Sequence, residues 1–328
     1  MKKQIHILAT GGTIASQSVN TLDEHYELAD VGIDALLTSV PELGQIADIQ
    51  TEQIAQVSSQ YMSEDIWFSL AKRIEALSAD DNVDGIVITH GTDTLEETAY
   101  FLNLVCHTDK PIVLTGAMRP ANALSSDGPK NILSAVTTAA SDAAIGKGVL
   151  VVLNNDIHAA RYVSKTHVSA LDAFKSPDFG MLGTIVNQDA VFYQQPTRLH
   201  TSQSEFSLDD ISSLPCVDII YGYAFADKHL VKAAVADGVK GIVSAGVGRG
   251  YQSAAIQEAL HEASQQDIIV VRSSRINGGI INRDPSMDDQ YGFVTGDNLN
   301  PQKARVLLML ALAKTQSHST IQTMFQQY

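Results

Sequence analysis

The chain has 328 residues, of which 45% are hydrophobic and 18% charged, and its formal net charge is -15 at pH 7. This length allows two domains with separate cores, and the acidic balance argues against nucleic acid, whose binding surfaces are basic. The longest apolar run, residues 306–313, is far too short to cross a bilayer.

The N-terminus has no apolar segment of the kind found in signal peptides, because Lys2 and Lys3 lead directly into a short strand-like run. The chain as given is therefore expected in the cytoplasm, with the periplasm as the alternative if a leader was removed. Cys106 and Cys216 fit neither a disulfide framework nor a metal site. Both are expected to be buried, inert thiols.

Strands and helices alternate from the N-terminus to about residue 195. Apolar runs indicate strands at residues 5–9, 85–89, 111–115 and 148–154, and helical patterns lie between them, for example at residues 64–77 and 96–105. This alternation predicts a parallel sheet with helices on both faces.

A polar stretch, residues 194–213, is predicted to be a linker. Beyond it, strands are expected at residues 217–221, 241–245 and 268–272, followed by an amphipathic helix after Asn300-Pro301. The predicted fold is α/β with two domains. Residues 1–193 form the larger, mostly parallel sheet and carry the catalytic threonines, and residues 214–328 form a smaller parallel α/β unit.

Two threonine-bearing turns, within residues 7–15 (ILATGGTIA) and 86–97 (IVITHGTDTLEE), carry most of the functional information. In each, a short apolar run meets glycine and hydroxyl residues, as a buried parallel strand does at its carboxyl end. Ligands of open α/β sheets bind outside those strand ends. Two hydroxyl clusters at one crevice therefore suggest nucleophilic chemistry on a small polar substrate.

Thr13 follows Gly11-Gly12, whose backbone can approach a ligand closely and offer amide donors. Its hydroxyl could attack a carbonyl if a base takes the proton, and an equal alternative is that Thr13 only caps a helix. No Gly-Lys-Ser/Thr follows, so the turn is not a phosphate-binding loop.

Thr92 and Asp93 precede a Thr94-x-x-Glu97 pattern, which predicts a capping box. Asp93 could bind a substrate ammonium or act as a second cap. Lys165 by itself is typical of a solvated surface group. It would become a usable base only if it were partly buried beside Thr92.

The remaining motifs argue against cofactors. Residues 246–250 (GVGRG) do not match the dinucleotide-binding pattern, so they predict a tight turn near a ligand or a subunit neighbour. His90 and His158 lack metal-ligand spacing, which makes metal catalysis unlikely on sequence grounds.

Residues 10–15 (TGGTIA) and 89–94 (THGTDT) together resemble the paired signature of the bacterial L-asparaginases. The resemblance runs nearly end to end. Further segments similar to the type II branch stand at residues 116–120, 126–129, 271–275 and 299–305. All of these motifs in this order are very specific.

The resemblance implies an amidohydrolase that converts L-asparagine to L-aspartate and ammonia. It implies that Thr13 is the nucleophile and forms an acyl-enzyme, and that Tyr26, in the family's mobile lid, helps to activate it. Thr92, Asp93 and Lys165 match a second triad, in which Lys165 assists Thr92 and Asp93 holds the substrate ammonium.

The resemblance also implies the substrate contacts. Ser59 and Gln60 match residues that bind the α-carboxylate and α-amino ends of the substrate, and the Ala117 carbonyl would accept a hydrogen bond from the side-chain amide. Backbone amides near Gly12 and Thr92 can stabilise the oxyanion that develops on attack. Family members are homotetramers whose sites lie between two subunits, without a cofactor or metal.

The chain departs from the family pattern at several positions. Ser16-Gln17 stands where many relatives have two glycines, and the partners of the family disulfide are not cysteines, which is consistent with a reducing compartment. Two neighbouring-subunit candidates also differ. Tyr251 aligns with an Asn or Ser that reaches the neighbour's substrate, and Ser286 with a glutamate that supports the lid tyrosine.

The sequence leaves two alternatives to an asparaginase. A glutaminase-asparaginase would accept both amides, and a catalytically silent amino-acid sensor would keep only the pocket. Intact Thr13, Thr92, Asp93 and Lys165 disfavour the sensor, because binding alone would not require all four.

Overall fold

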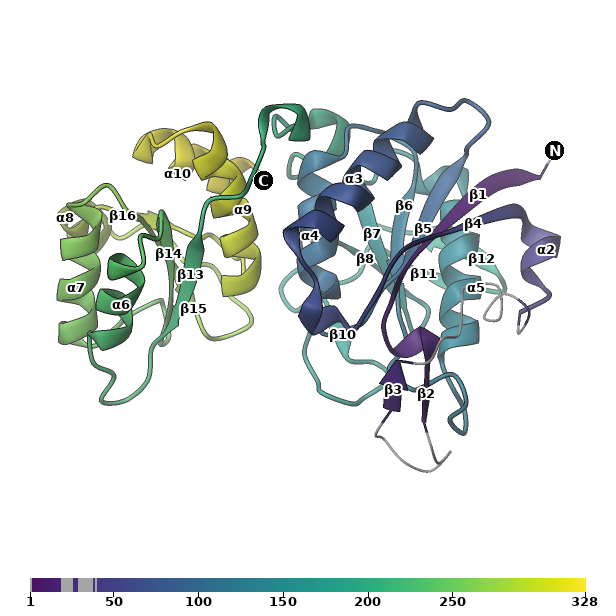
Figure 1. Ribbon diagram of the computed structural model, residues 1–328, viewed down its shortest axis with the longest axis horizontal. Helices are drawn as coiled ribbons and strands as arrows, with labels where there is room; N and C mark the ends of the chain where they lie inside the picture. The colour runs from purple at the N-terminus through teal and green to yellow at the C-terminus, as the bar shows by residue number, and fades with distance from the viewer. Residues whose placement is uncertain (1, 19–25, 29–37, 39) are drawn as a thin grey trace. The chain divides into compact units, whose positions relative to one another are not determined.

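The computed structural model describes residues 2–18, 26–28, 38 and 40–328, without the side chains of residues 15–18 and 26–28 (Figure 1). The chain divides into two compact units, Met1–Leu208 and Asp209–Tyr328, each with its own sheet. The division falls within residues 194–213, where the short 3-10 helices η4 (Thr201–Gln203) and η5 (Leu208–Asp210) form.

The first unit is built on an eight-stranded sheet with the order β12-β11-β8-β7-β6-β5-β1-β4. Its parallel part comprises β4 (Ala47–Val57), β1 (Lys3–Gly11), β5 (Gly85–Thr89), β6 (Ile112–Thr115) and β7 (Val149–Leu153). An antiparallel part follows with β8 (Asp156–Ala159), β11 (Gly183–Val186) and β12 (Asp189–Phe192). Strands β5, β6 and β7 are buried along their whole length, which explains their continuous apolar sequences.

Helices cover both faces of this sheet (Figure 1). On one face lie α3 (Glu64–Ser78) and α4 (Leu95–Val105), whose Trp67 and Phe101 rings stack with centroids 4.6 Å apart. The other face carries α2 (Leu43–Ile46) and α5 (Gly128–Ala139). Helix α3 begins where the Ser63 side chain accepts a hydrogen bond from the Ile66 amide, as a helix cap does.

Short elements carry several of the candidate residues. The 3-10 helices η1 (Thr13–Ala15) and η2 (Ser59–Tyr61) follow β1 and β4, and η3 (Asp142–Ala144) follows α5. Two strand pairs lie outside the main sheet. They are β2 (Ser16–Ser18) with β3 (Tyr26–Leu28), and β9 (Ser164–Lys165) with β10 (Phe174–Lys175).

The second unit contains a four-stranded parallel sheet of β13 (Val217–Tyr221), β14 (Gly241–Gly246), β15 (Ile269–Ser274) and β16 (Phe293–Thr295). Its helices are α6 (His229–Ala236), α7 (Ala254–Ser264), α8 (Pro285–Tyr291), α9 (Pro301–Lys314) and α10 (His318–Gln327). Asn300 caps α9 by accepting from the Lys303 amide, and Pro301 occupies its first turn, where a missing N–H costs nothing.

The predicted fold class is confirmed, because two α/β units contain a larger, mostly parallel sheet and a smaller parallel one. The expectation that both cysteines are buried is wrong for Cys216. Cys106 is buried, and burial raises the pKa of its thiol, but Cys216 is exposed because it precedes the first buried residue of β13.

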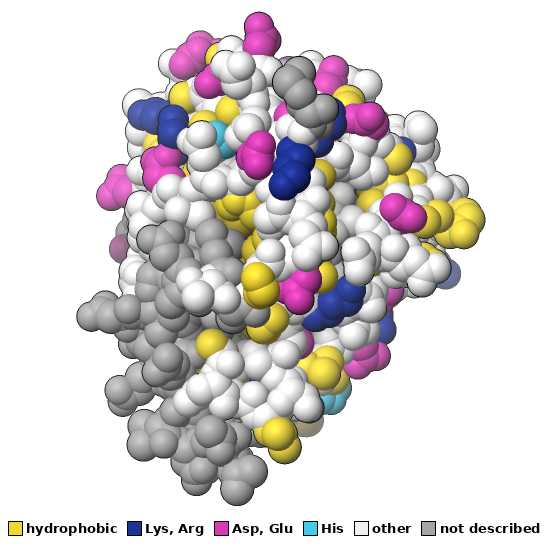
Figure 2. All heavy atoms as spheres, turned by 90° about the vertical axis from the view of Figure 1, so that its right-hand side faces the viewer, with side chains coloured by type: hydrophobic (Ala, Val, Ile, Leu, Met, Phe, Trp, Pro, Cys, Tyr) yellow, Lys and Arg dark blue, Asp and Glu magenta, His cyan; other side chains and the backbone are white. Residues whose placement is uncertain are grey.

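Acidic and basic side chains are mixed on the face shown in Figure 2. Among the described residues on the face in Figure 2, Asp and Glu side chains are interspersed with Lys and Arg and do not leave one broad basic area. None of the helices in the described part of the chain is long and apolar enough to span a membrane.

Candidate active site

The carboxyl ends of β1 and β5 bring the two threonine turns side by side. The strands are parallel neighbours with Ala9 opposite Thr89, and the buried Thr10 hydroxyl donates to the Thr89 carbonyl at 2.9 Å. The juxtaposition expected from the sequence is therefore a consequence of strand order.

Two glycines allow the turns to touch. Gly12 has a φ of +85°, and a Cβ at this position would lie 2.4 Å from Gly91 Cα. A Cβ on Gly91 would in turn lie 2.8 Å from Ser59 Cβ. The ends of β1 and β5 therefore lie backbone against backbone, and Gly91 also lies against Ser59 at the start of η2. Thr13 and Thr92, which follow these glycines, lie in neighbouring turns.

Thr13 is the first residue of η1 and is only 5% exposed. The backbone of Tyr26 lies in β3, opposite Ser18 of β2, and its side chain lies outside the described part of the chain. Ser16-Gln17 also belongs to β2. The predicted assistance of Tyr26 to Thr13 therefore stays a prediction.

Thr92, Asp93 and Lys165 form a hydrogen-bonded set. Lys165 Nζ donates to Thr92 Oγ1 at 2.9 Å and to Asp93 Oδ1 at 2.7 Å. The Lys165 side chain is 15% exposed and that of Asp93 61% exposed, while Thr92 is 5% exposed. The condition set by the sequence, a partly buried Lys165 beside Thr92, is met.

The Thr94 half of the predicted capping box is wrong. Thr94 occupies the N-cap of α4, but its side chain accepts no capping bond. Its hydroxyl instead donates to the Ser59 carbonyl at 2.8 Å, and the Asp93 amide donates to Ser59 Oγ at 3.2 Å. The Ser59 carbonyl needs a donor in this buried turn, and this tertiary partner replaces the local cap.

Ser59, Gln60 and Ala117 belong to segments that border the Thr92 turn. Ser59 is buried and Gln60 exposed within η2, and Ala117 is buried just after β6. A Cβ on Gly116 would lie 3.2 Å from Thr92 Cγ2, which places the start of the Ala117 segment against Thr92. These segments and the two threonine turns thus lie at the carboxyl ends of the parallel strands.

His90, within the second threonine turn, contributes no positive charge near neutral pH. Complete burial lowers the pKa of its imidazole to about 4, and its Nδ1 lies 2.7 Å from the Gly91 carbonyl. No group of three or more potential metal ligands occurs among the described residues.

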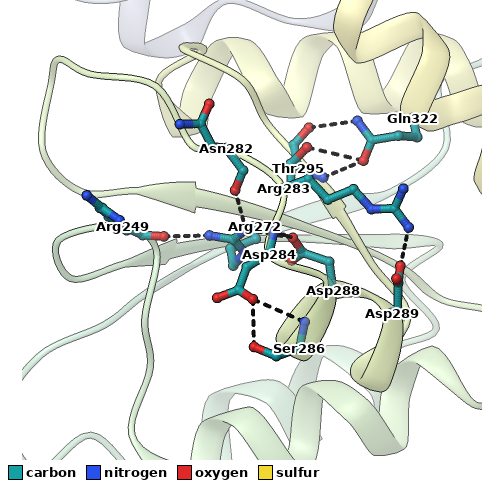
Figure 3. Close-up of polar contacts among 10 residues, drawn as sticks. All are labelled: Arg249, Arg272, Asn282, Arg283, Asp284, Ser286, Asp288, Asp289, Thr295 and Gln322. Carbon is teal, nitrogen blue, oxygen red and sulfur yellow. Dashed lines mark hydrogen bonds and ion pairs between the residues drawn. The ribbon is translucent and has the colours of Figure 1, made fainter.

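The two remaining candidates lie in the second unit. Tyr251 is 43% exposed and forms a β-bridge with Val247, which closes the turn at residues 247–251. Ser286 is exposed in the first turn of α8, and its hydroxyl donates to Asp284 Oδ1 at 2.6 Å (Figure 3).

One buried guanidinium holds the segments that carry these two residues (Figure 3). Arg272 forms a bidentate ion pair with Asp288, with both N–O distances at 2.7 Å and both side chains at most 3% exposed. It also donates to the carbonyls of Arg249 and Asn282. Loss of one partner would leave a buried charge unpaired, which typically costs about 3–5 kcal/mol.

Comparison with known proteins gives a consistent result over nearly the whole chain. The family model "Asparaginase, N-terminal" matches residues 4–198, and "Glutaminase/Asparaginase C-terminal domain" matches residues 216–325. The L-asparaginase 2 of Bacillus subtilis (strain 168) is 48% identical over 326 residues, which are 99% of this chain and 86% of that protein.

Two further proteins are similar to the same extent. The glutaminase-asparaginase of Pseudomonas fluorescens biotype A is 46% identical over 325 residues, 98% of this chain and 90% of that protein. The solved structure of a probable cytoplasmic L-asparaginase from Campylobacter jejuni has a TM-score of 0.97 at 46% identity, and the match covers 100% of both chains.

Proposed function

This chain belongs to the asparaginase family, as its threonine motifs led us to expect, and on that premise we propose its reaction. It hydrolyses the side-chain amide of L-asparagine to L-aspartate and ammonia through an acyl-enzyme on Thr13. The observation that carries the proposal is the bonded set of Lys165, Thr92 and Asp93 beside the Thr13 turn. Release of ammonia from L-asparagine by the purified protein tests it.

In the first half of the reaction, Thr13 Oγ bonds to the amide carbon and its proton passes to a base. The carbon–nitrogen bond then breaks, and the nitrogen leaves as ammonia after it receives a proton. In the second half, water adds to the acyl carbon and Thr13 recovers its hydroxyl. Backbone amides near Gly12 and Thr92 are suited to stabilise the oxyanion in both halves.

Lys165 and Thr92 are assigned the proton transfers, because Lys165 Nζ and Thr92 Oγ1 lie 2.9 Å apart, within the distance that such transfers need. Asp93, whose side chain is largely exposed, binds the substrate ammonium. Tyr26 is proposed to assist Thr13.

Ser59 and Gln60 bind the two charged groups on the α-carbon of the substrate, and the Ala117 carbonyl accepts from its amide. Ser59 Oγ already accepts from the Asp93 amide. A serine hydroxyl has one donor and two acceptor positions, so it retains its hydrogen for a carboxylate. This arrangement supports the assignment of Ser59 to the α-carboxylate.

We propose the cytoplasm as the compartment, which is also the compartment in the name of the Campylobacter jejuni protein. The cysteine-poor sequence is consistent with it. Recovery of the protein in an osmotic-shock fraction would contradict this assignment.

Substitution of the nucleophile gives the most direct prediction. Thr13→Ala should lower kcat by several orders of magnitude and leave the fold intact, because an alanine side chain cannot form the acyl-enzyme. Thr13→Ser keeps a hydroxyl and should retain far more turnover than the alanine variant. A folded Thr13→Ala enzyme with more than about a tenth of the wild-type turnover would contradict the assignment of Thr13 as the nucleophile.

Thr92 and Lys165 should act as one unit, since their side chains are directly bonded. The double variant Thr92→Val with Lys165→Met should be little slower than the more severe single variant, measured as kcat for ammonia release. Additive losses would mean that the two side chains work independently.

The active species should be a homotetramer, with Tyr251 and Ser286 contributed to a neighbouring subunit's site. This expectation rests on the resemblance, because both residues lie in the second unit and family sites draw these segments from a neighbouring subunit. Light scattering at the assay concentration measures the assembly, and an active monomer would overturn it.

The enzyme should prefer asparagine to glutamine by at least about tenfold in kcat/KM, since one methylene in a fitted pocket is worth about 10–200-fold. The bulky Tyr251, in place of Asn or Ser, leaves less room for the longer substrate. Similar kcat/KM values for the two amides would instead support a glutaminase-asparaginase, the activity in the name of the Pseudomonas fluorescens relative. If the Tyr251→Asn variant keeps the preference for asparagine, Tyr251 is not the cause of that preference.

A further inference from the structure

A buried carboxylate contacts the main chain of Lys165 and has no role in the reaction described above. Glu96, in the first turn of α4, is only 3% exposed. A carboxylate is seldom buried without hydrogen bonds that replace its hydration. Glu96 Oε2 accepts from the Lys165 amide at 2.6 Å and from Ser164 Oγ at 2.9 Å.

The strand that Glu96 binds is short. Strand β9 consists of Ser164 and Lys165 alone, and it pairs with the equally short β10, away from the eight-stranded sheet. The bonds to Glu96 join this strand, and with it the main chain of Lys165, directly to α4.

The same turn carries the groups that Lys165 must reach. Thr92 and Asp93 stand just before Thr94, the N-cap of α4, and Glu96 is the second residue of that helix. Lys165 therefore contacts this turn twice, through its amide at Glu96 and through Nζ at Thr92 and Asp93. A lysine side chain has much rotamer freedom, so a fixed starting point limits where Nζ can go.

We propose that Glu96 is a positioning residue for Lys165. Its carboxylate holds the main chain of Lys165 at the distance from which Nζ bonds to Thr92. The proposal deepens the function given above and rests on the role assigned there to Lys165 and Thr92. The length of the Glu96 side chain and its acceptor oxygen matter for this role, and its negative charge matters less.

Two conservative variants separate reach from charge. Glu96→Gln keeps the length and an acceptor oxygen for the Lys165 amide, while its NH2 can donate to Ser164 Oγ. Glu96→Asp keeps the charge but is one methylene shorter. Glu96→Gln should retain kcat within about threefold of wild type, and Glu96→Asp should lose at least about tenfold with KM changed less than threefold, because a displacement of about 1 Å can cost 100-fold. The opposite order would show that the charge, and not the reach, matters.

A matched control removes a comparable bond from the same helix. Asn103 of α4 is buried and accepts from the Val149 amide at 3.0 Å, so it holds β7 as Glu96 holds β9. Asn103→Ala should lower the melting temperature and leave kcat unchanged. If Glu96→Asp likewise lowers only the melting temperature, Glu96 is merely structural and the proposal fails.

Combination with Lys165→Met completes the test. In that background Glu96→Asp should lower kcat by less than about twofold, since the group that it positions is already gone. A loss as large as in the wild-type background would overturn the positioning role. Near-normal turnover of Lys165→Met alone would instead refute the proposed function, so the two failures are distinguishable.

Discussion

The site depends on the close approach of three backbone segments that only residues without a Cβ permit. Gly12 and Gly91 meet at the ends of β1 and β5, and Gly91 also lies against Ser59. Protein interiors are densely packed, so a single added carbon at 2.4 Å from a backbone atom would force the segments apart. The spacing between the Thr13 and Thr92 turns is therefore fixed by packing before any catalytic group is considered.

Hydrogen bonds then fix the orientation of the turns. Thr10 donates across to β5, and Ser59 is bonded to both Asp93 and Thr94. Each of these bonds satisfies a polar group that is buried or partly buried. Loss of one bond would leave such a group without a hydrogen-bond partner. The polar network explains how a turn rich in hydroxyl groups is ordered without a regular strand or helix.

Lys165 contacts two carboxylates. Its ammonium contacts the Asp93 carboxylate, and its main chain is held by the Glu96 carboxylate. The described ionisable groups of this cluster thus comprise one cation and two carboxylates, a balance that suits a substrate with an ammonium group. The large negative charge of the whole chain is not needed for this conclusion, because local geometry decides the field in a site.

The sequence alone determined the fold class, most strands of the parallel sheets and the two threonine turns, because buried parallel strands leave continuous apolar runs and their ends need glycine. It did not indicate β4, an edge strand that is half exposed and rich in polar residues. Nor does it indicate that Glu96 is buried, since an acidic residue in the first turn of a helix is normally a surface feature. Only the tertiary structure decided that Lys165 bonds to Thr92, that Thr94 binds Ser59 in place of a cap, and that Glu96 is buried. These contacts join residues more than 30 positions apart, and no local pattern encodes a partner at that separation.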